Sequence, residues 1–316
     1  MKIGIIGNGF VGSAIAEGFK LYCDDLLVYD SQKERSVHSL KEVSNADLIF
    51  ISVPTPMKDL NNREADLSIL YSVFKDLNNY KCKGLLIIKS TVPVGTTATI
   101  QEKYKHLNIC HSPEFLTARK AKIDFCTPSR NIVGYTKDKK VALKLKNLYK
   151  KRFPGTTCLL MSSDESEMVK YMANCFFATK VSFFNEMYLL AHKLGLNWES
   201  LLEGVLSDGR IGVSHYDVPG HDGDFGFGGT CFPKDINALI NLMKSNNIKP
   251  YVLEGAWKQN IEVRKDKDWE NNPSALSIEE INKHKNLIKE GWKKTDQGYF
   301  HPDYGNDLSG CGHDYI

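Results

Sequence analysis

An excess of one charge and a long apolar run are both missing from this 316-residue sequence. Its 41 Lys and Arg against 38 Asp and Glu leave a net charge of +3, which gives no electrostatic reason to expect nucleic acid or an anionic membrane as partner. No apolar run approaches the roughly 20 residues that a membrane span needs. A glycine motif that begins at residue 7 leaves no room for a signal peptide before folded structure. We therefore expect a cytoplasmic protein with no membrane or nucleic-acid partner.

Cysteine pairing is missing as well. The chain has eight cysteines, but it has no CxxC pair and no Cys/His spacing of the kind that binds zinc. Cys110, Cys158 and Cys175 stand in apolar or strand-like surroundings, where a reduced thiol packs as a small hydrophobe. We expect no metal site and a reducing compartment.

Short apolar runs alternate with amphipathic segments in the first half of the chain. The runs predicted to be buried parallel strands are 2–6, 26–29, 48–53, 85–89, 131–135 and 156–160. The segments predicted to be helices between them are 11–22, 66–78 and 95–105. This alternation predicts an α/β fold whose first domain, residues 1–162, has a Rossmann-type parallel sheet.

A segment without proline or glycine follows, from Ser163 to Leu194. Ser162 and Glu165 are spaced as a capping box, and Gly195 suits the end of a helix. About 30 helical residues would span about 45 Å, much more than an average helix. Such a helix bridges two domains or forms the core of a dimer.

The remainder of the chain is predicted to be helical and then polar. Further helix-like sequence lies at 197–206 and 234–262. We expect an all-α domain over 163–262, to which the family resemblance described below assigns dimerisation and catalysis, followed by a polar tail over 263–316. Ser277 and Glu280 form a second capping box and predict one helix in this tail, over 277–292.

The motif GNGFVG (7–12) follows a predicted strand and opens a predicted helix. Gly7 permits the tight turn, Gly9 lets the backbone approach a pyrophosphate, and Gly12 allows close packing of helix on strand. Asp30 ends the second predicted strand, where a carboxylate would accept hydrogen bonds from the ribose hydroxyls and favour NAD over NADP. The alternative is a glycine turn that holds no ligand.

The stretch GFGGTCFPKD (226–235) places a lone cysteine after a glycine-rich turn. If a helix begins at Cys231, its dipole and open N–H groups favour a thiolate, which is the nucleophilic form. Pro233 fits the first turn of such a helix, and Asp235 lies one turn after the cysteine. A buried cysteine beside a structural turn is the alternative.

Lys170 and Asn174 are spaced by four residues, so they share one face of the long predicted helix. They could stabilise a developing alkoxide on a substrate. Alternatively they form the hydrated stripe of this apolar helix, together with Glu167 and Lys180.

Taken together, these motifs resemble the UDP-glucose/GDP-mannose dehydrogenases, NAD-dependent enzymes that oxidise the C6 alcohol of a nucleotide sugar to a carboxylate. The stretches that carry the resemblance are GNGFVG (7–12), VPTP (53–56), STVPVGT (90–96), SPEFL (112–116), EMVKYMANCFFATKVSFFNE (167–186) and GFGGTCFPKD (226–235). They cover about residues 1–262.

The resemblance implies a role for each of a set of residues. Cys231 would capture an aldehyde as a thiohemiacetal, from which a second hydride transfer gives a thioester. Lys170 and Asn174 would hold the C6 oxygen. The water site would be lined by Asp235, Glu114 and Thr91, and the choice of general base among the acids stays open. The residues implied near NAD are Gly7, Gly9, Phe10, Val11, Gly12, Asp30, Arg35, Thr55, Thr91 and Lys234. Those implied near the substrate are Glu114, Phe115, Leu116, Lys170, Asn174, Arg210, Tyr216, Phe227 and Gly228.

The resemblance also implies a homodimer built on the long helix, in which Arg210 reaches the neighbouring site. Two departures from the family pattern stand out. The segment 263–316 shows no strand alternation and is too short for the nucleotide-binding domain that usually follows, and the loop 219–229 is longer than usual. UDP-glucose is the first expected substrate. Alternatives are another sugar or sugar phosphate, a two-electron hydroxyacid dehydrogenase, and a non-catalytic NAD-binding assembly protein.

Overall fold

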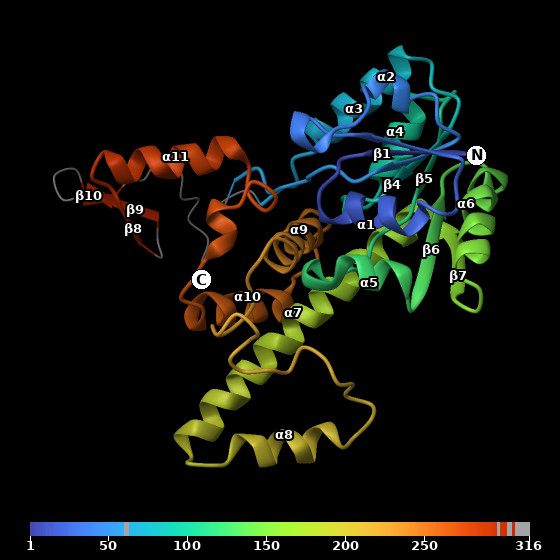
Figure 1. Ribbon diagram of the computed structural model, residues 1–316. Helices are drawn as coiled ribbons and strands as arrows, with labels where there is room; N and C mark the ends of the chain where they lie inside the picture. The colour runs from blue at the N-terminus through green and yellow to red at the C-terminus, as the bar shows by residue number, and fades with distance from the viewer. Residues whose placement is uncertain (60–62, 296–297, 302–304, 307–316) are drawn as a thin grey trace. The chain divides into compact units, whose positions relative to one another are not determined.

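The computed structural model describes residues 1–59, 63–295, 298–301 and 305–306 (Figure 1). These residues form two compact units. Unit 1 comprises 1–55 and 67–172, and unit 2 comprises 56–66 and the described part of 173–316. The boundaries predicted at 162/163 and 262/263 remain predictions, and the unit division falls inside the long helix instead.

Unit 1 is built on a seven-stranded sheet of order β2-β1-β3-β4-β5-β6-β7. The strands are β1 (Lys2–Ile6), β2 (Asp25–Tyr29), β3 (Leu48–Ile51), β4 (Leu85–Ile88), β5 (Asn108–His111), β6 (Arg130–Tyr135) and β7 (Thr157–Ser162). Neighbouring strands are parallel except β5 and β6, which run antiparallel. The predicted α/β class is confirmed, and the expectation of a wholly parallel sheet is corrected at this pair. No strand is predicted at β5, because its sequence NICH has only two apolar residues, between the polar Asn108 and His111.

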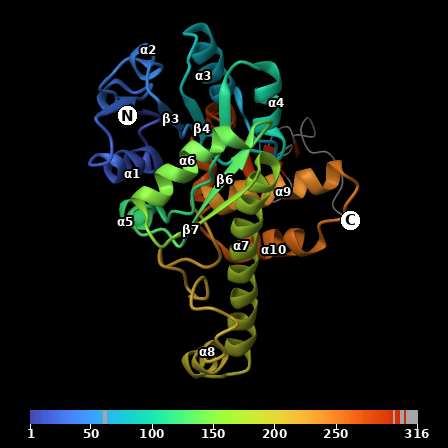
Figure 2. The same cartoon turned by 90° about the vertical axis from the view of Figure 1, so that its right-hand side faces the viewer.

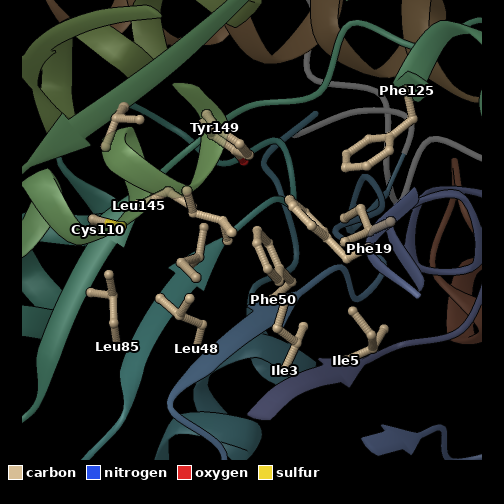
Figure 3. Close-up of a cluster of buried hydrophobic side chains, with 14 of the residues drawn as sticks. Ile3, Ile5, Phe19, Leu48, Phe50, Leu85, Cys110, Phe125, Leu145 and Tyr149 are labelled. Atoms are coloured by element: carbon tan, nitrogen blue, oxygen red, sulfur yellow. The ribbon is translucent and has the colours of Figure 1, made fainter. Parts of the chain in front are cut away.

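Both faces of this sheet are covered by helices. The helices of unit 1 before the long one are α1 (Phe10–Phe19), α2 (Leu40–Val43), α3 (Ser68–Asn79), α4 (Thr96–Lys103), α5 (Ala121–Cys126) and α6 (Lys139–Arg152). Buried side chains of α1, α5 and α6 pack on one face, and those of α2, α3 and α4 pack on the other. Because successive strand residues point to opposite faces, Ile5 and Phe50 join the first cluster while Ile6 and Ile51 join the second. Figure 3 shows the first cluster, with the rings of Phe19, Phe50 and Tyr149 close to one another.

The long helix α7 (Ser163–Lys193) has 31 residues, close to the predicted range. The predicted capping box is present: the Ser162 N–H donates to the Glu165 carboxylate at 2.7 Å, and the Glu165 N–H donates to Ser162 Oγ at 3.2 Å. Gly195 ends the helix in the left-handed region, with φ of 67°. The helix begins in unit 1 and continues into unit 2. Figure 2 shows α8 at its C-terminal end.

Unit 2 contains the remaining helices and a small second sheet. Its elements after α7 are α8 (Trp198–Leu206), α9 (Cys231–Ser245), α10 (Tyr251–Val263), the 3-10 helix η3 (Asp268–Asn271), α11 (Ile278–Lys289), β8 (Lys293–Thr295), β9 (Gly298–His301) and β10 (Gly305–Asn306). The helix-like stretch 234–262 is two helices, because Asn247 is left-handed (φ 59°) and Pro250 caps the second. The helix predicted at 277–292 is present as α11. The antiparallel pairing of β8, β9 and β10 is not predicted, since such short strands show no alternation.

The segment 56–66 belongs to unit 2 through pairing with the residues before α11. The Met57 N–H donates to the Ala275 carbonyl and the Ser277 N–H donates to the Met57 carbonyl, each at 2.8 Å. Met57 also joins a buried cluster around Trp269 and Leu276. Among the helices of the described residues, none combines the length and apolarity required to cross a bilayer.

Candidate active site

The glycine motif forms the turn between β1 and α1. Gly7 has φ of 88°, and a Cβ there would lie 2.5 Å from the Ser52 carbonyl oxygen. A Cβ on Gly12 would collide with the Gly7 carbonyl, so the helix packs too closely for any side chain. A Cβ on Gly9 would meet nothing within 4 Å. The turn is therefore tight toward the sheet and open at Gly9, directly before the first residue of α1, Phe10. This is the shape that admits a pyrophosphate.

Asp30 follows β2 and is held against the glycine turn. Its carboxylate accepts hydrogen bonds from the backbone N–H of Asn8 at 2.6 Å and of Gln32 at 2.9 Å. The Asn8 side chain donates to the Arg35 carbonyl at 2.8 Å, which ties the next turn to the same place. A carboxylate retains further acceptor capacity after two such bonds, so Asp30 can still accept from a ribose. The residues present thus fit an NAD molecule.

Two threonines lie after the carboxyl ends of β3 and β4, where open α/β sheets bind their ligands. The buried hydroxyl of Thr55 donates to the Thr91 carbonyl at 2.6 Å. Of the residues implied near NAD on α1, Val11 is partly buried and packs against the first core cluster. Phe10 is about two fifths exposed.

Glu114 and Lys170 form a buried ion pair in unit 1. Lys170 Nζ lies 2.8 Å from Glu114 Oε1, and neither side chain is more than 7% exposed. The other carboxylate oxygen accepts the Leu116 N–H at 2.6 Å. Burial raises the pKa of Glu114, but the charge and hydrogen bond of Lys170 outweigh it and leave the pKa below its ordinary value. Glu114 is therefore an ionised carboxylate whose two oxygens are both in use.

A second buried lysine, Lys89, was not singled out from the sequence. It follows β4 directly, and its Nζ donates to the Pro113 carbonyl at 3.0 Å and to Ser112 Oγ at 3.4 Å. Burial lowers the pKa of Lys89 to about 7, with Lys170 acting in the same direction and Glu114 against it. The available signal was a lysine at the end of an apolar strand, immediately before STVPVGT.

A cavity of about 270 Å³ opens beside Glu114 and Lys89, and its lining also includes Phe115 and Leu116. The Arg130 guanidinium stacks on the Phe115 ring, with 4.1 Å between them. The cavity thus combines cationic and anionic groups with one aromatic face, a mixture suited to a polar ligand.

The stretch 226–235, here called the thiol loop, lies in unit 2. The helix predicted to begin at Cys231 is present. Cys231 is the first residue of α9, Thr230 is its N-cap, and Pro233 falls in the first turn. The thiol is partly exposed, with Thr230 Oγ1 3.6 Å from its Sγ. A partly exposed cysteine at a helix N-terminus has the surroundings of a reactive thiol.

Asp235 lies one turn further along α9 and is 1% exposed. One of its oxygens accepts the Asn174 side-chain amide at 2.6 Å, and the other forms an ion pair with Lys234. The backbone carbonyl of Asp235 accepts a hydrogen bond from Cys175 Sγ at 3.6 Å. The structure therefore joins three predicted site residues, Asn174, Lys234 and Asp235, in one buried group.

The other predicted substrate residues of unit 2 have different surroundings. Arg210 forms a forked pair with Asp208 and its side chain is 90% exposed. Tyr216 packs edge-on against Phe184. Phe227 is buried, and Gly228 lies against the side chains of Arg264 and Asp268, which follow α10.

Both units match domains of one known family. The NAD binding domain of the UDP-glucose/GDP-mannose dehydrogenase family matches residues 34–153, and the central domain of that family matches residues 164–262.

Individual relatives agree with these matches. The UDP-glucose 6-dehydrogenase of Rickettsia prowazekii (strain Madrid E) is 38% identical over 297 residues, which cover 82% of this chain and 67% of the relative. That of Rickettsia typhi (strain ATCC VR-144 / Wilmington) is 37% identical over 245 residues, covering 76% of this chain and 54% of the relative. The solved structure of a UDP-glucose dehydrogenase from the hyperthermophilic archaeon Pyrobaculum islandicum superposes with a TM-score of 0.73 at 28% identity, covering 83% of this chain and 68% of that one. The chain spans about half to two thirds of the length of these relatives.

Proposed function

Because the chain belongs to the UDP-glucose/GDP-mannose dehydrogenase family, we propose that it oxidises the C6 alcohol of a nucleotide sugar, UDP-glucose first, to a carboxylate. The observation that carries this proposal is the position of Cys231 at the first residue of α9, one turn before the buried group of Asp235, Lys234 and Asn174.

A four-electron oxidation explains why a dehydrogenase would need a thiol. Removal of the first hydride and the hydroxyl proton turns the alcohol into an aldehyde, whose carbon has no hydride to give until a heteroatom adds to it. The Cys231 thiolate adds to that carbon and forms a thiohemiacetal. Loss of a second hydride gives a thioester, and water then releases the carboxylate and the thiol. The balance is one alcohol, two NAD⁺ and one water giving one carboxylate, two NADH and three protons.

The charged groups of unit 1 suit the oxygen of the reacting carbon. Lys170 supplies a buried ammonium, whose attraction to a developing alkoxide is strong where water is excluded. Glu114 keeps this lysine in position through their 2.8 Å contact. We assign Asn174 to the same oxygen because it lies one turn further along α7.

Proton transfer and the attacking water are assigned to Asp235, with Thr91 and Glu114 as further contributors. Asp235 is held rigidly by Asn174 and Lys234, which is what a group that orients water requires. Both acids accept hydrogen bonds at both oxygens, and we favour Asp235 as the proton acceptor because it lies one turn after Cys231 on α9.

NAD supplies the hydride acceptor when it is bound. The glycine turn would hold the pyrophosphate at the N-terminus of α1, and Asp30 would accept from the ribose hydroxyls. Arg35, Thr55, Thr91 and Lys234 complete the proposed cofactor contacts.

We also propose that the chain acts as a homodimer built on α7, with Arg210 serving the neighbouring site. Exposed apolar side chains along α7 and the turn to α8 support this: Phe176, Phe183, Leu190, Leu194 and Leu196. An apolar surface of this kind marks a protein interface. Lys180 on α7 donates to the carbonyls of Ile211 and Gly212, which fixes the turn that carries Arg210 beside this surface.

The test is the stoichiometry of the reaction. The protein and NAD are incubated with UDP-sugars, GDP-sugars, sugar phosphates and free sugars, and NADH is followed by its absorbance. Two NADH per substrate consumed, with release of an acid, is the expected result. One NADH per substrate would instead indicate a two-electron dehydrogenase, and none with any sugar would indicate a non-catalytic protein.

A further inference from the structure

The loop before Cys231, residues 219–229, is bound by residues that follow the part of the chain matched by the family's central domain. That domain match ends at residue 262, and Arg264 comes two residues later. The Arg264 guanidinium lies 2.7 Å from an Asp222 carboxylate oxygen and donates to the Phe225 carbonyl at 3.3 Å. The loop 219–229, which the family resemblance indicates to be longer than usual, thus supplies a partner for Arg264.

Two more carboxylates complete this attachment. Asp224 of the loop accepts the backbone N–H groups of Lys265 at 3.0 Å and Asp266 at 2.8 Å. Asp268 reaches the other way and accepts the Gly229 N–H with both its oxygens, at 3.0 and 2.9 Å. Gly229 is two residues before the thiol.

The glycines of GFGG are explained by the same contacts. A Cβ on Gly228 would lie 2.5 Å from Asp268 Oδ1 and would collide with the Arg264 guanidinium. A Cβ on Gly226 would collide with Asn260, whose side chain forms two hydrogen bonds with the Phe227 backbone. Close approach by residues 260–268 therefore requires a loop without side chains at these positions.

The attached segment is itself anchored to the core of unit 2. Trp269, next to Asp268, is fully buried and packs on Trp257 with 5.6 Å between ring centres. Arg264 is 5% exposed. Its side chain is 3% exposed, whereas those of Asp222 and Asp268 are 35% and 39% exposed. The buried guanidinium therefore holds these carboxylates in place, because a buried charge without a partner would be costly.

We propose that residues 264–268 form a clasp that positions the thiol loop, with Arg264 and Asp268 as positioning residues for Cys231. The clasp holds the backbone on the N-terminal side of the thiol while α9 holds the other side, so the sulfur keeps one direction of approach. This inference rests on the proposed role of Cys231 as the nucleophile.

The test compares Asp268→Ala and Asp268→Asn with Asp266→Asn as a matched control. Asp266 lies in the same segment, and its contacts with Asp224 and Arg264 run through its backbone. The rate of Cys231 alkylation by iodoacetamide is measured by peptide mass spectrometry, with Cys158 as an internal reference, alongside kcat, KM, NAD affinity and thermal unfolding.

We expect the Asp268→Ala change to alter the alkylation rate and lower kcat by about 10-fold or more, as loss of a charge-assisted hydrogen bond predicts. NAD affinity should not change, Asp268→Asn should recover part of the rate, and the control should behave as the unchanged protein. If Asp268→Ala does not fold, Asp268→Asn alone decides the matter through the same two rates. The clasp is overturned if both rates match the unchanged protein, or if the alkylation rate is unchanged and kcat falls only in proportion to the folded fraction. Because alkylation needs no substrate, its result stands even if no nucleotide sugar is oxidised.

Discussion

Cys231 is the residue on which the proposed chemistry depends, and its surroundings differ from those of the buried thiols. Cys110 and Cys175 are buried. Burial raises the pKa of the Cys110 thiol to about 12 and also raises that of the Cys175 thiol. Both thiols are thereby kept in the unreactive protonated form. Cys231 instead lies partly exposed at the start of a helix.

Replacing Cys231 with Ser should stop steady turnover while leaving NAD binding intact. A serine hydroxyl is a far weaker nucleophile at neutral pH, so we expect kcat to fall on the order of 10³-fold or more, with the reaction stalling at an aldehyde or a slowly cleaved ester. Acid release and NADH are measured with the same substrate. Cys158→Ser, at a half-buried position in unit 1, is the control. Normal acid production by Cys231→Ser would remove the nucleophile assignment.

Replacing Asp30 with Ala should weaken NAD binding by about 10- to 100-fold, the worth of one charged hydrogen bond to the ribose. Asp30 also accepts the Asn8 N–H, so Asp30→Asn, which keeps one acceptor oxygen, separates the ribose contact from support of the turn. Calorimetry gives the affinities, and far-UV circular dichroism checks the fold. An affinity for NAD that does not change in either variant would refute the ribose contact.

At the scale of elements, α7 supports the start of α4. The buried Glu167 carboxylate of α7 accepts the Gly95 N–H at 2.6 Å, the Thr97 N–H at 2.8 Å and the Thr97 hydroxyl at 2.5 Å. It thereby caps α4 and fixes the turn that ends STVPVGT. Glu167 was considered from the sequence only as part of a hydrated stripe, and that reading is wrong because the side chain is fully buried.

Burial raises the pKa of Glu167 to about 7, although its three donors act in the opposite direction. Between its ordinary pKa of 4.5 and this value, the unfolded chain loses the proton while the folded chain keeps it. Stability therefore falls as pH rises through this window, by about 3 kcal/mol for a shift of this size, and is constant above it.

Glu167→Gln removes the titrating group, so its free energy of unfolding should not fall with pH as that of the unchanged protein does. The stability of the variant relative to the unchanged protein should therefore be greater at pH 8 than at pH 5. Urea unfolding at both pH values measures the difference. Glu102→Gln, at an exposed position of α4, should show no such gain. Equal pH dependence of Glu167→Gln and the unchanged protein would contradict the prediction.

At the scale of the whole molecule, the family resemblance, the dehydrogenase class and the NAD-binding domain predicted from the motifs are confirmed. The dimer and the role of Arg210 are proposals that a complementation experiment can test. Co-expression of Cys231→Ser with Arg210→Ala places half the chains in mixed dimers, each with one intact site if Arg210 serves its neighbour. Activity should return to about a quarter of the normal value by this statistical argument.

The matched control is co-expression of Cys231→Ser with Asn174→Ala. Both residues act within one chain in the proposed site, so mixed dimers gain no site that has both. Equal recovery from the two pairs, or recovery from neither, would show that Arg210 does not complete a neighbouring site.

Much of unit 1 could be predicted because its signals are local. The strands and the glycine turn follow from apolar runs and backbone restrictions, and the capping box of α7 follows from two residues three apart. The start of α9 at Cys231 was predicted in the same way. β5 was not predicted, because only two of its four residues are apolar. The strands of the tail were not predicted either, because they show no alternation of apolar and polar residues.

By itself, the sequence determined the fold class, the family, the cofactor and the residue types of the proposed chemistry, since each depends on short motifs whose members are near in the chain. Only the tertiary structure decided which charges are paired and which are buried. The Lys170–Glu114 pair, the engagement of Asp235 by Asn174, the buried Lys89 and the clasp of Asp268 on Gly229 join residues 23 to 61 positions apart. Such contacts arise from packing of whole elements, and the electrostatic state of a buried group depends on neighbours that no local pattern specifies.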